Sequence, residues 1–222
     1  MRRPQHWRDV EADPRPGMRV ADGWPAMVPT LGSEALDRLF LEARSIQTFL
    51  DQPVSDETVR RLYELVKLTP TGFNSQPGRY VFVRSPAAKE VLAPALSSSN
   101  RKKMMAAPLT VIVAYDPRFY ERLPELFPSY DARKLFLDAP GLIEQTGERN
   151  STLQAAFLIV AARALGLDAG PMSGFREAEI DGAFFADGRG KTTMVINLGY
   201  GDRSALAPRG PRLAFEDTAR IV

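Results

Sequence analysis

Apolar side chains recur at helical spacing in several parts of the chain. The pattern predicts helices over Ser33–Arg44, Ser55–Lys67, Ala87–Leu92, Asn150–Leu165 and Glu177–Phe185. The pattern is strongest over Asn150–Leu165, because its centre, Ala155–Ala162, is apolar nearly all round. Such a helix is buried on most faces. In a chain of 222 residues this often means that a second subunit covers part of the helix.

Three apolar runs have the character of β-strands. The run Leu109–Ala114 is continuous and largely β-branched, which predicts a buried central strand. Shorter runs predict strands over Tyr80–Val83 and Thr193–Leu198. Because strands and helices mix without regular strand–helix–strand alternation, the order of elements favours an α+β fold over a doubly wound parallel sheet.

The segments between these elements are expected to be less regular. Ser97–Asn100 has the composition of a polar loop, and Gly170–Phe175 that of a Gly/Pro-rich connection. Pro117–Pro128 is aromatic and irregular, which suggests a lid or covering segment. Residues 132–145 show only a partial helical pattern.

The first 32 residues differ from the rest of the chain. Five prolines fall within residues 1–30, and the segment has neither a helical nor a strand period. We therefore expect a flexible N-terminal extension over residues 1–32 and one folded domain over residues 33–222. A non-functional leader that results from an upstream start codon explains the same composition equally well.

Two residue counts limit the chemistry that the side chains can supply. The chain has no cysteine and one histidine, His6, which lies in the extension. Disulfides, structural zinc ribbons, iron–sulfur clusters and a cysteine nucleophile are therefore excluded, and a Ser-His-Asp triad would need His6 as its base. The adjacent carboxylate pairs do not face each other on a helix, so we expect no metal. An enzyme of this composition would rely on carboxylates, hydroxyls or an organic cofactor.

The charge balance gives no reason to expect nucleic acid or an anionic membrane as a partner. The chain has 29 basic and 27 acidic residues, for a net charge of +2. Its pI of about 9.0 reflects the scarcity of groups that titrate near neutrality. No run of 18 apolar residues and no secretory signal is found, so we expect a cytoplasmic protein.

Three segments combine permissive backbones with small polar side chains. They are Arg44–Phe49, Thr71–Pro77 and Gly170–Gly174. Such backbones can approach a flat ligand closely, while amides and hydroxyls suit a flavin edge and Arg44 suits a phosphate. Each segment also has an ordinary structural interpretation, such as a surface ion pair, a turn or a plain connection. The glycine-rich fingerprints of Rossmann enzymes and P-loop NTPases are missing from the sequence.

Residues 33–222 resemble the flavin-dependent nitroreductase family, most closely its malonic semialdehyde reductase branch, which is associated with pyrimidine degradation. The motifs that carry the resemblance are Pro53–Thr58, Pro94–Ser98, Phe119–Pro124, Arg149–Ser151, Ala164–Asp168, Gly170–Phe175 and Gly199–Asp202. The resemblance implies a nitroreductase-like α+β fold with a mixed, mostly antiparallel sheet. It also implies a homodimer with the long helix at its interface, one non-covalent FMN in each interfacial site, and NAD(P)H as co-substrate.

The same resemblance implies a set of cofactor-binding residues. Its members are Arg44, Ser45 and Gln47 for the phosphate and ribityl chain; Asn74, Ser75 and Gln76 near the ring; Pro171, Met172, Ser173 and Gly174 on the other side of the ring; and Arg209 or Arg212 from the tail. Two positions depart from the family pattern, which commonly has a basic residue at Gln47 and a tryptophan at Gly78. The glycine suggests an enlarged or looser pocket.

The branch implies a ping-pong reaction in which NAD(P)H reduces the flavin and malonic semialdehyde is then reduced to 3-hydroxypropionate. Arg122 and Arg149 are candidates for the substrate carboxylate by their chemistry, although structural ion pairs are the commoner role of such residues. A general NAD(P)H nitro- or quinone reductase is an alternative within the family. A flavin-binding protein without catalytic activity is an alternative of another class.

Overall fold

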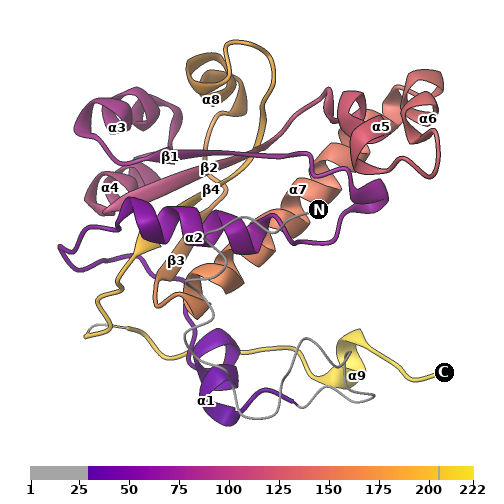
Figure 1. The fold of residues 1–222 in the computed structure, drawn as a ribbon. Coiled ribbons are helices and arrows are strands. Elements are labelled where there is room, and N and C mark those ends of the chain that lie inside the picture. Colours follow the sequence, from indigo (N-terminus) through magenta and orange to yellow (C-terminus); the bar gives the residue numbers. More distant parts are fainter. Residues whose placement is uncertain (1–29, 205) are drawn as a thin grey trace. The chain divides into compact units, whose positions relative to one another are not determined.

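The computed structural model describes residues 30–204 and 206–222 (Figure 1). The chain divides into Met1–Ser33 and Glu34–Val222, and the sheet with the helices packed on it belongs to the second unit. The predicted extension over residues 1–32 therefore lies almost wholly outside the described residues.

The described chain contains α-helices of 4 to 24 residues and four strands. The α-helices are α1 (Ser33–Leu36), α2 (Asp56–Val66), α3 (Pro86–Leu92), α4 (Ser98–Ala106), α5 (Leu123–Leu126), α6 (Ala132–Asp138), α7 (Gly141–Ala164), α8 (Glu177–Phe184) and α9 (Phe215–Thr218). The strands are β1 (Gly78–Val83), β2 (Leu109–Tyr115), β3 (Asp168–Met172) and β4 (Lys191–Gly199). A π-helical segment, Asp37–Leu41, continues α1, and 3-10 turns cover Gly72–Asn74, Ala93–Ala95 and Phe119–Arg122.

The sheet has the strand order β1-β2-β4-β3, and every pairing between its strands is antiparallel. The fold is thus α+β, as predicted. The one parallel pairing among the described residues is an isolated bridge between Ser45 and Ala169. The interior strand β2 is buried along its whole length, which confirms the prediction from its continuous apolar run.

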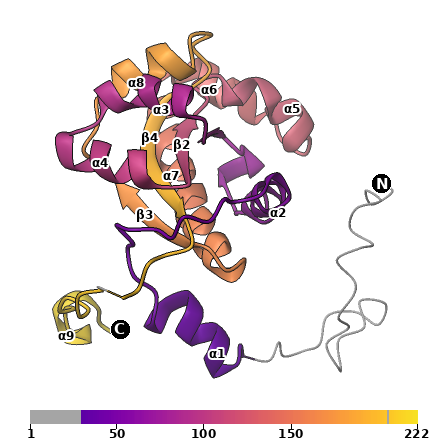
Figure 2. The ribbon, with the colours of Figure 1, turned by 90° about the vertical axis from the view of Figure 1, so that its left-hand side faces the viewer.

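Helices cover both faces of the sheet (Figures 1 and 2). Val111 and Val113 face a core formed with α2 and α7. Ile112, which points to the opposite face, packs in a second core with residues of α3, α4 and α8. This alternation is what a strand buried on both faces requires.

Several helix ends lie where the local sequence predicts them. Ser55 caps α2, because its Oγ accepts a hydrogen bond from the backbone N–H of Thr58 at 3.1 Å. Gly166 follows α7 with φ of +89°, as expected of a glycine at a helix C-terminus. The start of α7 was predicted at Asn150 but lies at Gly141. The prediction missed the first turns because, after Leu142 and Ile143, the side chains up to Arg149 are polar or absent and show no apolar period.

Three predictions about irregular segments were wrong. The expected polar loop at Ser97–Asn100 leads into α4, and Gly170–Met172 lies within β3. The expected covering segment at Pro117–Pro128 contains buried side chains, because Phe119 and Leu123 form a small third core with Phe136.

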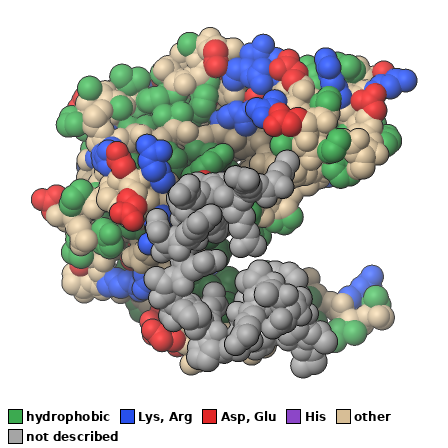
Figure 3. Space-filling view, viewed as in Figure 1, with side chains coloured by type: hydrophobic (Ala, Val, Ile, Leu, Met, Phe, Trp, Pro, Cys, Tyr) green, Lys and Arg blue, Asp and Glu red, His purple; other side chains and the backbone are tan. Residues whose placement is uncertain are grey.

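Charged side chains of both signs lie on the surface (Figure 3). On the face viewed in Figure 3, basic and acidic side chains lie intermixed. None of the helices in residues 30–204 and 206–222 is both long and apolar enough to cross a bilayer.

Candidate functional site

The first predicted segment, around Arg44, lies alongside the edge strand β3. The backbone N–H of Ile46 donates to the Ala169 carbonyl at 3.0 Å, next to the parallel bridge of Ser45. The Ile46 side chain is buried, whereas Ser45 and Gln47 are exposed. An extended backbone turns alternate side chains to opposite sides, so Ser45 and Gln47 face away from the core together.

Two arginines that are 165 positions apart in sequence meet at the same backbone carbonyls. Arg44 Nη1 donates to the carbonyls of Leu41 and Ala43 at 3.3 and 3.0 Å. Arg209 Nη2 donates to those of Phe40, Leu41 and Ala43 at 2.9, 2.6 and 2.9 Å. Desolvation lowers the pKa of Arg209, and the charges of Arg44 and Arg212 lower it further. Within the described residues neither Arg44 nor Arg209 forms an ion pair with a carboxylate, so the pair can accept an anion.

The third predicted segment continues from β3. Pro171 and Ser173 are exposed, whereas the Met172 side chain is buried in the second core, so a contact from Met172 would come from its backbone. The Gly174 carbonyl accepts hydrogen bonds from the backbone N–H of Ser97 at 3.0 Å and from Asn100 Nδ2 at 3.3 Å. The start of α4 therefore fixes this segment.

Gly170 allows the Arg44 segment to approach β3. A Cβ at this position would lie 2.2 Å from the Ile46 carbonyl oxygen. We expect Gly170→Ala to lower the free energy of unfolding by about 1–3 kcal/mol, because a backbone atom must move to relieve the overlap. Urea denaturation checks this against Gly182→Ala on α8, where a Cβ would meet nothing within 4 Å. Equal midpoints for the two variants would contradict the close approach.

The second predicted segment, Thr71–Pro77, has a strained backbone. Phe73, Asn74 and Gln76 have φ of 55°, 49° and 42°, and they are the only non-glycine residues with positive φ in the described chain. Such conformations cost roughly 1 kcal/mol or more each, and they persist only where surrounding contacts impose them. Their concentration in one loop marks it as a candidate site independently of any motif.

Helix α7 supplies the contacts that hold both ends of this loop. Asn150 Oδ1 accepts the Gly72 N–H at 2.8 Å, and Gln154 Oε1 accepts the Gly78 N–H at 2.8 Å. Both amides are buried, and their spacing of four residues places them on one side of the helix. The side chain of Asn74 donates to the Leu126 carbonyl at 3.1 Å, which ties the loop tip to α5.

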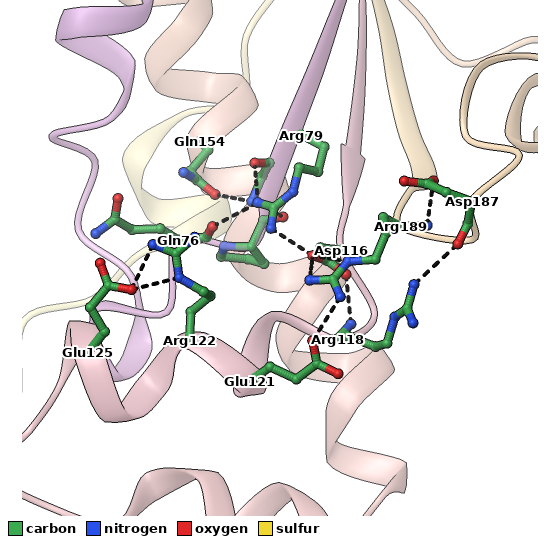
Figure 4. Close-up of polar contacts among 12 residues, drawn as sticks. Gln76, Arg79, Asp116, Arg118, Glu121, Arg122, Glu125, Gln154, Asp187 and Arg189 are labelled. Carbon is green, nitrogen blue, oxygen red and sulfur yellow. Dashed lines mark hydrogen bonds and ion pairs between the residues drawn. The ribbon is translucent and has the colours of Figure 1, made fainter.

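An ion-pair network around the buried Asp116 fixes the C-terminal half of the same loop (Figure 4). Arg79 Nη1 donates to the carbonyls of residues 76–78 at 3.4, 3.3 and 3.0 Å. Arg79 Nη2 pairs with Asp116 Oδ2 at 2.7 Å. Asp116, whose side chain is fully buried, also binds Arg189, and Arg189 binds Glu121 at 2.7 Å. A buried carboxylate requires such pairing, and here the pairing immobilises the loop.

The sheet places the predicted segments at opposite edges. The segments around Arg44 and Gly170–Gly174 adjoin β3, whereas Thr71–Pro77 precedes β1. Strands β2 and β4 separate β1 from β3, which corresponds to roughly 14 Å at ~4.8 Å per strand spacing. Figure 1 likewise shows the loop before β1 next to α5, away from β3. One chain therefore brings together Arg44, Ser45, Gln47, Arg209 and the β3 segment, but not the loop.

The two candidate arginines for a substrate carboxylate lie apart. Arg122 lines a pocket of about 490 Å³ with Ser75 and Gln76, and it pairs with Glu125 at 2.7 Å. Arg149 instead lines a hollow of about 650 Å³ on the outer side of α7. The space beside Gly78 is not empty, because Tyr80 Oη and Gln154 Oε1 lie 2.6 and 2.7 Å from where a Cβ would be.

Only some of the residues that shape this site could be identified from the sequence. Asn150, Gln154, Arg79 and Asp116 were not among the predicted site residues. Asn150, Gln154 and Asp116 are distant in sequence from the loop or from the arginine that holds it. Arg79 directly follows the loop, but its contacts with the carbonyls of residues 76–78 have no signature in the sequence.

The described hydrogen bonds of Arg212 go to the carbonyls of its neighbours Gly210 and Pro211, at 3.0 Å each. Unlike Arg209, it is therefore not joined to the carbonyls near Arg44 by a described hydrogen bond.

Comparison with models of protein families identifies a family for most of the chain. Residues 41–200 match the model of the nitroreductase family. A provisionally named NADH dehydrogenase/NAD(P)H nitroreductase of Rhodopseudomonas palustris is 52% identical over 196 residues, which is 88% of this chain and 100% of the relative. A protein of the same provisional name from Burkholderia lata is 55% identical over 192 residues, 86% of this chain and 98% of the relative.

Solved structures show the same fold at lower sequence identity. A provisionally assigned nitroreductase of Exiguobacterium sibiricum, crystallised in complex with FMN, superposes with a TM-score of 0.72. It is 20% identical, and the match covers 88% of this chain and 100% of the other.

Proposed function

The chain belongs to the nitroreductase family, and we propose that it is an NAD(P)H-dependent oxidoreductase that binds FMN without a covalent bond. The observation that carries this proposal is the meeting of Arg44 and Arg209 at shared carbonyls beside β3. Two guanidinium groups without a described carboxylate partner suit a phosphate dianion, which can accept several charge-assisted hydrogen bonds. The exposed Ser45 and Gln47 adjoin this pair and would hold the ribityl chain.

The remaining predicted residues fit the edges and faces of a flavin ring. Pro171, Ser173 and Gly174 are exposed, Ser173 offers its hydroxyl, and the contacts of Gly174 with α4 keep the segment in place. Asn74 and Gln76 offer side-chain amides on a loop held by α7 and Arg79. Pre-organised donors and acceptors of this kind bind a planar heterocycle at low entropic cost.

When it is bound, FMN would supply the chemistry of hydride transfer between NAD(P)H and the second substrate. The residues of this chain need only bind and orient the partners, exclude water and hold the reacting carbon at ~3–3.5 Å. This division of work explains how a chain without cysteine, and with its one histidine at position 6, can be a redox enzyme.

For the second substrate we propose malonic semialdehyde. Its aldehyde carbon would take the hydride, its oxygen a proton, and the product would be 3-hydroxypropionate. The resemblance to the malonic semialdehyde reductase branch supports this choice, and so does the position of Arg122 in a pocket next to the loop at Ser75. A nitro or quinone acceptor is the alternative within the family, and the names of the relatives from R. palustris and B. lata favour it.

Anaerobic spectroscopy tests the function in two steps. NADH or NADPH is expected to bleach the FMN absorbance of the purified protein, and added malonic semialdehyde is expected to restore it. Recovery with a neutral quinone but not with the aldehyde would assign the enzyme to the general reductases. A flavin that neither nicotinamide reduces would leave a flavin-binding protein without this activity.

We further propose a homodimer that acts in the cytoplasm. The separation of the predicted segments across the sheet supports a site built by two chains, with Arg44 from one protomer and the Asn74 loop from its partner. The outer side of α7 carries the apolar side chains Leu153 and Phe157, each 44% exposed in the single chain. Together with Ala156 they form a stripe at helical spacing that a second copy would cover.

A further inference from the structure

Two residues that line the pocket next to the strained loop have a buried hydroxyl group without a hydrogen-bond partner in the described part of the chain. The pocket is lined by the loop at Ser75 and Gln76, by β1, by α2 and by the Phe119–Leu126 segment. Ser75 is 1% exposed, and its Oγ has no hydrogen-bond partner among the described residues. The same holds for the buried Tyr80 Oη. A buried hydroxyl without a partner destabilises the fold, so a ligand or ordered water is expected to bind both groups.

The backbone at Gly78 creates the room for the tyrosine hydroxyl. Tyr80 Oη lies 2.6 Å from where a Cβ of residue 78 would be, so any other residue there would displace it. Burial raises the pKa of Tyr80 well above its usual range. The hydroxyl therefore stays protonated at neutral pH and can donate its proton to an acceptor atom.

The charged residues that line the pocket are all basic. Lys67, Arg79 and Arg122 line it, and no aspartate or glutamate does so within the described part of the chain. Arg79 is committed to Asp116 and to the loop carbonyls. Lys67 and Arg122 pair with Glu64 and Glu125 at 2.5 and 2.7 Å, next to the pocket. Both cations keep further N–H donors, since an ammonium has three and a guanidinium five.

Aromatic side chains complete the walls. Tyr63, Phe82 and Phe119 line the pocket, and Phe119 is buried in the third core. A ligand that suits these pocket walls has an apolar body and one group that accepts several hydrogen bonds and carries negative charge. A carboxylate has this chemistry, with two oxygens and about four lone pairs.

We propose that the pocket binds the carboxylate of an organic acid through Ser75 Oγ, Tyr80 Oη and the cations Lys67 and Arg122, and that an aldehyde or quinone carbonyl elsewhere on this acid takes up a hydride, supplied by NAD(P)H through the flavin, and a proton from water. The second part rests on the proposed function, because it needs the loop that carries Ser75 and Gln76 to lie against the flavin. The proposal limits the acceptors to acids with a carbon chain or ring that fits about 490 Å³.

Direct binding tests the pocket without turnover. Calorimetry on the purified holoprotein compares 3-phenylpropionate with 3-phenylpropanamide, which has the same body without the charge. We expect the acid to bind at least tenfold more tightly, and Tyr80→Phe and Ser75→Ala each to remove most of that preference. Tyr200→Phe is the matched control, since Tyr200 packs against the first core and does not line the pocket.

Equal affinities for acid and amide would overturn the proposal and leave ordered water as the partner of the two hydroxyls. An acid preference that survives in both Tyr80→Phe and Ser75→Ala would also overturn it. Retained FMN absorbance and an unchanged thermal midpoint show that each variant is folded. Two conservative substitutions keep the test valid if one of them destabilises the protein.

Kinetics separates the pocket from the proposed function. With a quinone that carries a carboxylate and its neutral ester, we expect the acid to have at least a fivefold lower KM in the wild type, and Tyr80→Phe to abolish the difference. Flavin that NAD(P)H never bleaches would refute the function, while the acid and amide affinities would still decide the pocket. If the working enzyme has equal KM values for the acid and the ester, the pocket is not the acceptor site, but the proposed function still holds.

Discussion

Replacing Arg209 with alanine is expected to raise the dissociation constant for FMN by roughly 10- to 150-fold. The guanidinium lies against the carbonyls of residues 40, 41 and 43, next to Arg44. A charge-assisted hydrogen bond contributes about 1.5–3 kcal/mol, which corresponds to this range of affinity. Fluorescence titration of the apoprotein with FMN measures the change. Arg44→Ala should have an effect of similar size, because both side chains would meet one phosphate.

Arg212→Ala is the matched control, since it removes the same charge from the same tail. The described hydrogen bonds of Arg212 go to Gly210 and Pro211, its immediate neighbours. We expect a change of less than threefold in FMN affinity. The double variant Arg44→Ala/Arg209→Ala should lose less FMN binding free energy than the two single losses added together, because two groups that contact one ligand are coupled. A large loss in Arg212→Ala with none in Arg209→Ala would move the phosphate contact to Arg212.

Local signals in the sequence were sufficient for much of the fold. The cap at Ser55, the left-handed Gly166 and the β-branched run of β2 each act within a few residues, so the chain encodes them locally. Helix α4 was missed because Met104 is its only buried residue, which leaves no apolar period to read. Strand β3 was missed because glycine and proline disfavour a strand interior, yet an edge strand tolerates both.

The site was predictable only as separate segments. Motifs identified Arg44, Asn74 and Pro171. They could not show that two strands, β2 and β4, separate the loop of Asn74 from the β3 edge, where Arg44 and Pro171 lie. The contacts that shape the loop were not predictable either. Asn150 binds Gly72 over a sequence separation of 78 positions, and Gln154 binds Gly78 over a separation of 76 positions. The three left-handed residues of the loop have no signature in composition, since none is a glycine.

Phe157→Arg is expected to convert the protein to a monomer and to abolish FMN binding. The side chain is 44% exposed on the outer side of α7, at the centre of the proposed interface. A two-fold axis would place two such arginines in one apolar interface, and truncating or charging such a centre costs about 2–4 kcal/mol or more. Analytical ultracentrifugation and the flavin absorbance measure both losses. Val91→Arg on α3 is the control, because Val91 is 53% exposed on the opposite face of the sheet.

Mixing two inactive variants gives the sharper test of a shared site. In a heterodimer of Arg44→Ala and Asn74→Ala chains, one site would combine both substitutions, and the other would combine the intact Arg44 of one chain with the intact Asn74 of its partner. Co-expressed chains carrying different affinity tags, purified over both, are therefore expected to bind about half the FMN of the wild type. Each variant alone should bind far less. A site formed within one chain leaves every site in the heterodimer damaged, so the absence of recovery in a verified heterodimer would assign Arg44 and Asn74 to separate functions.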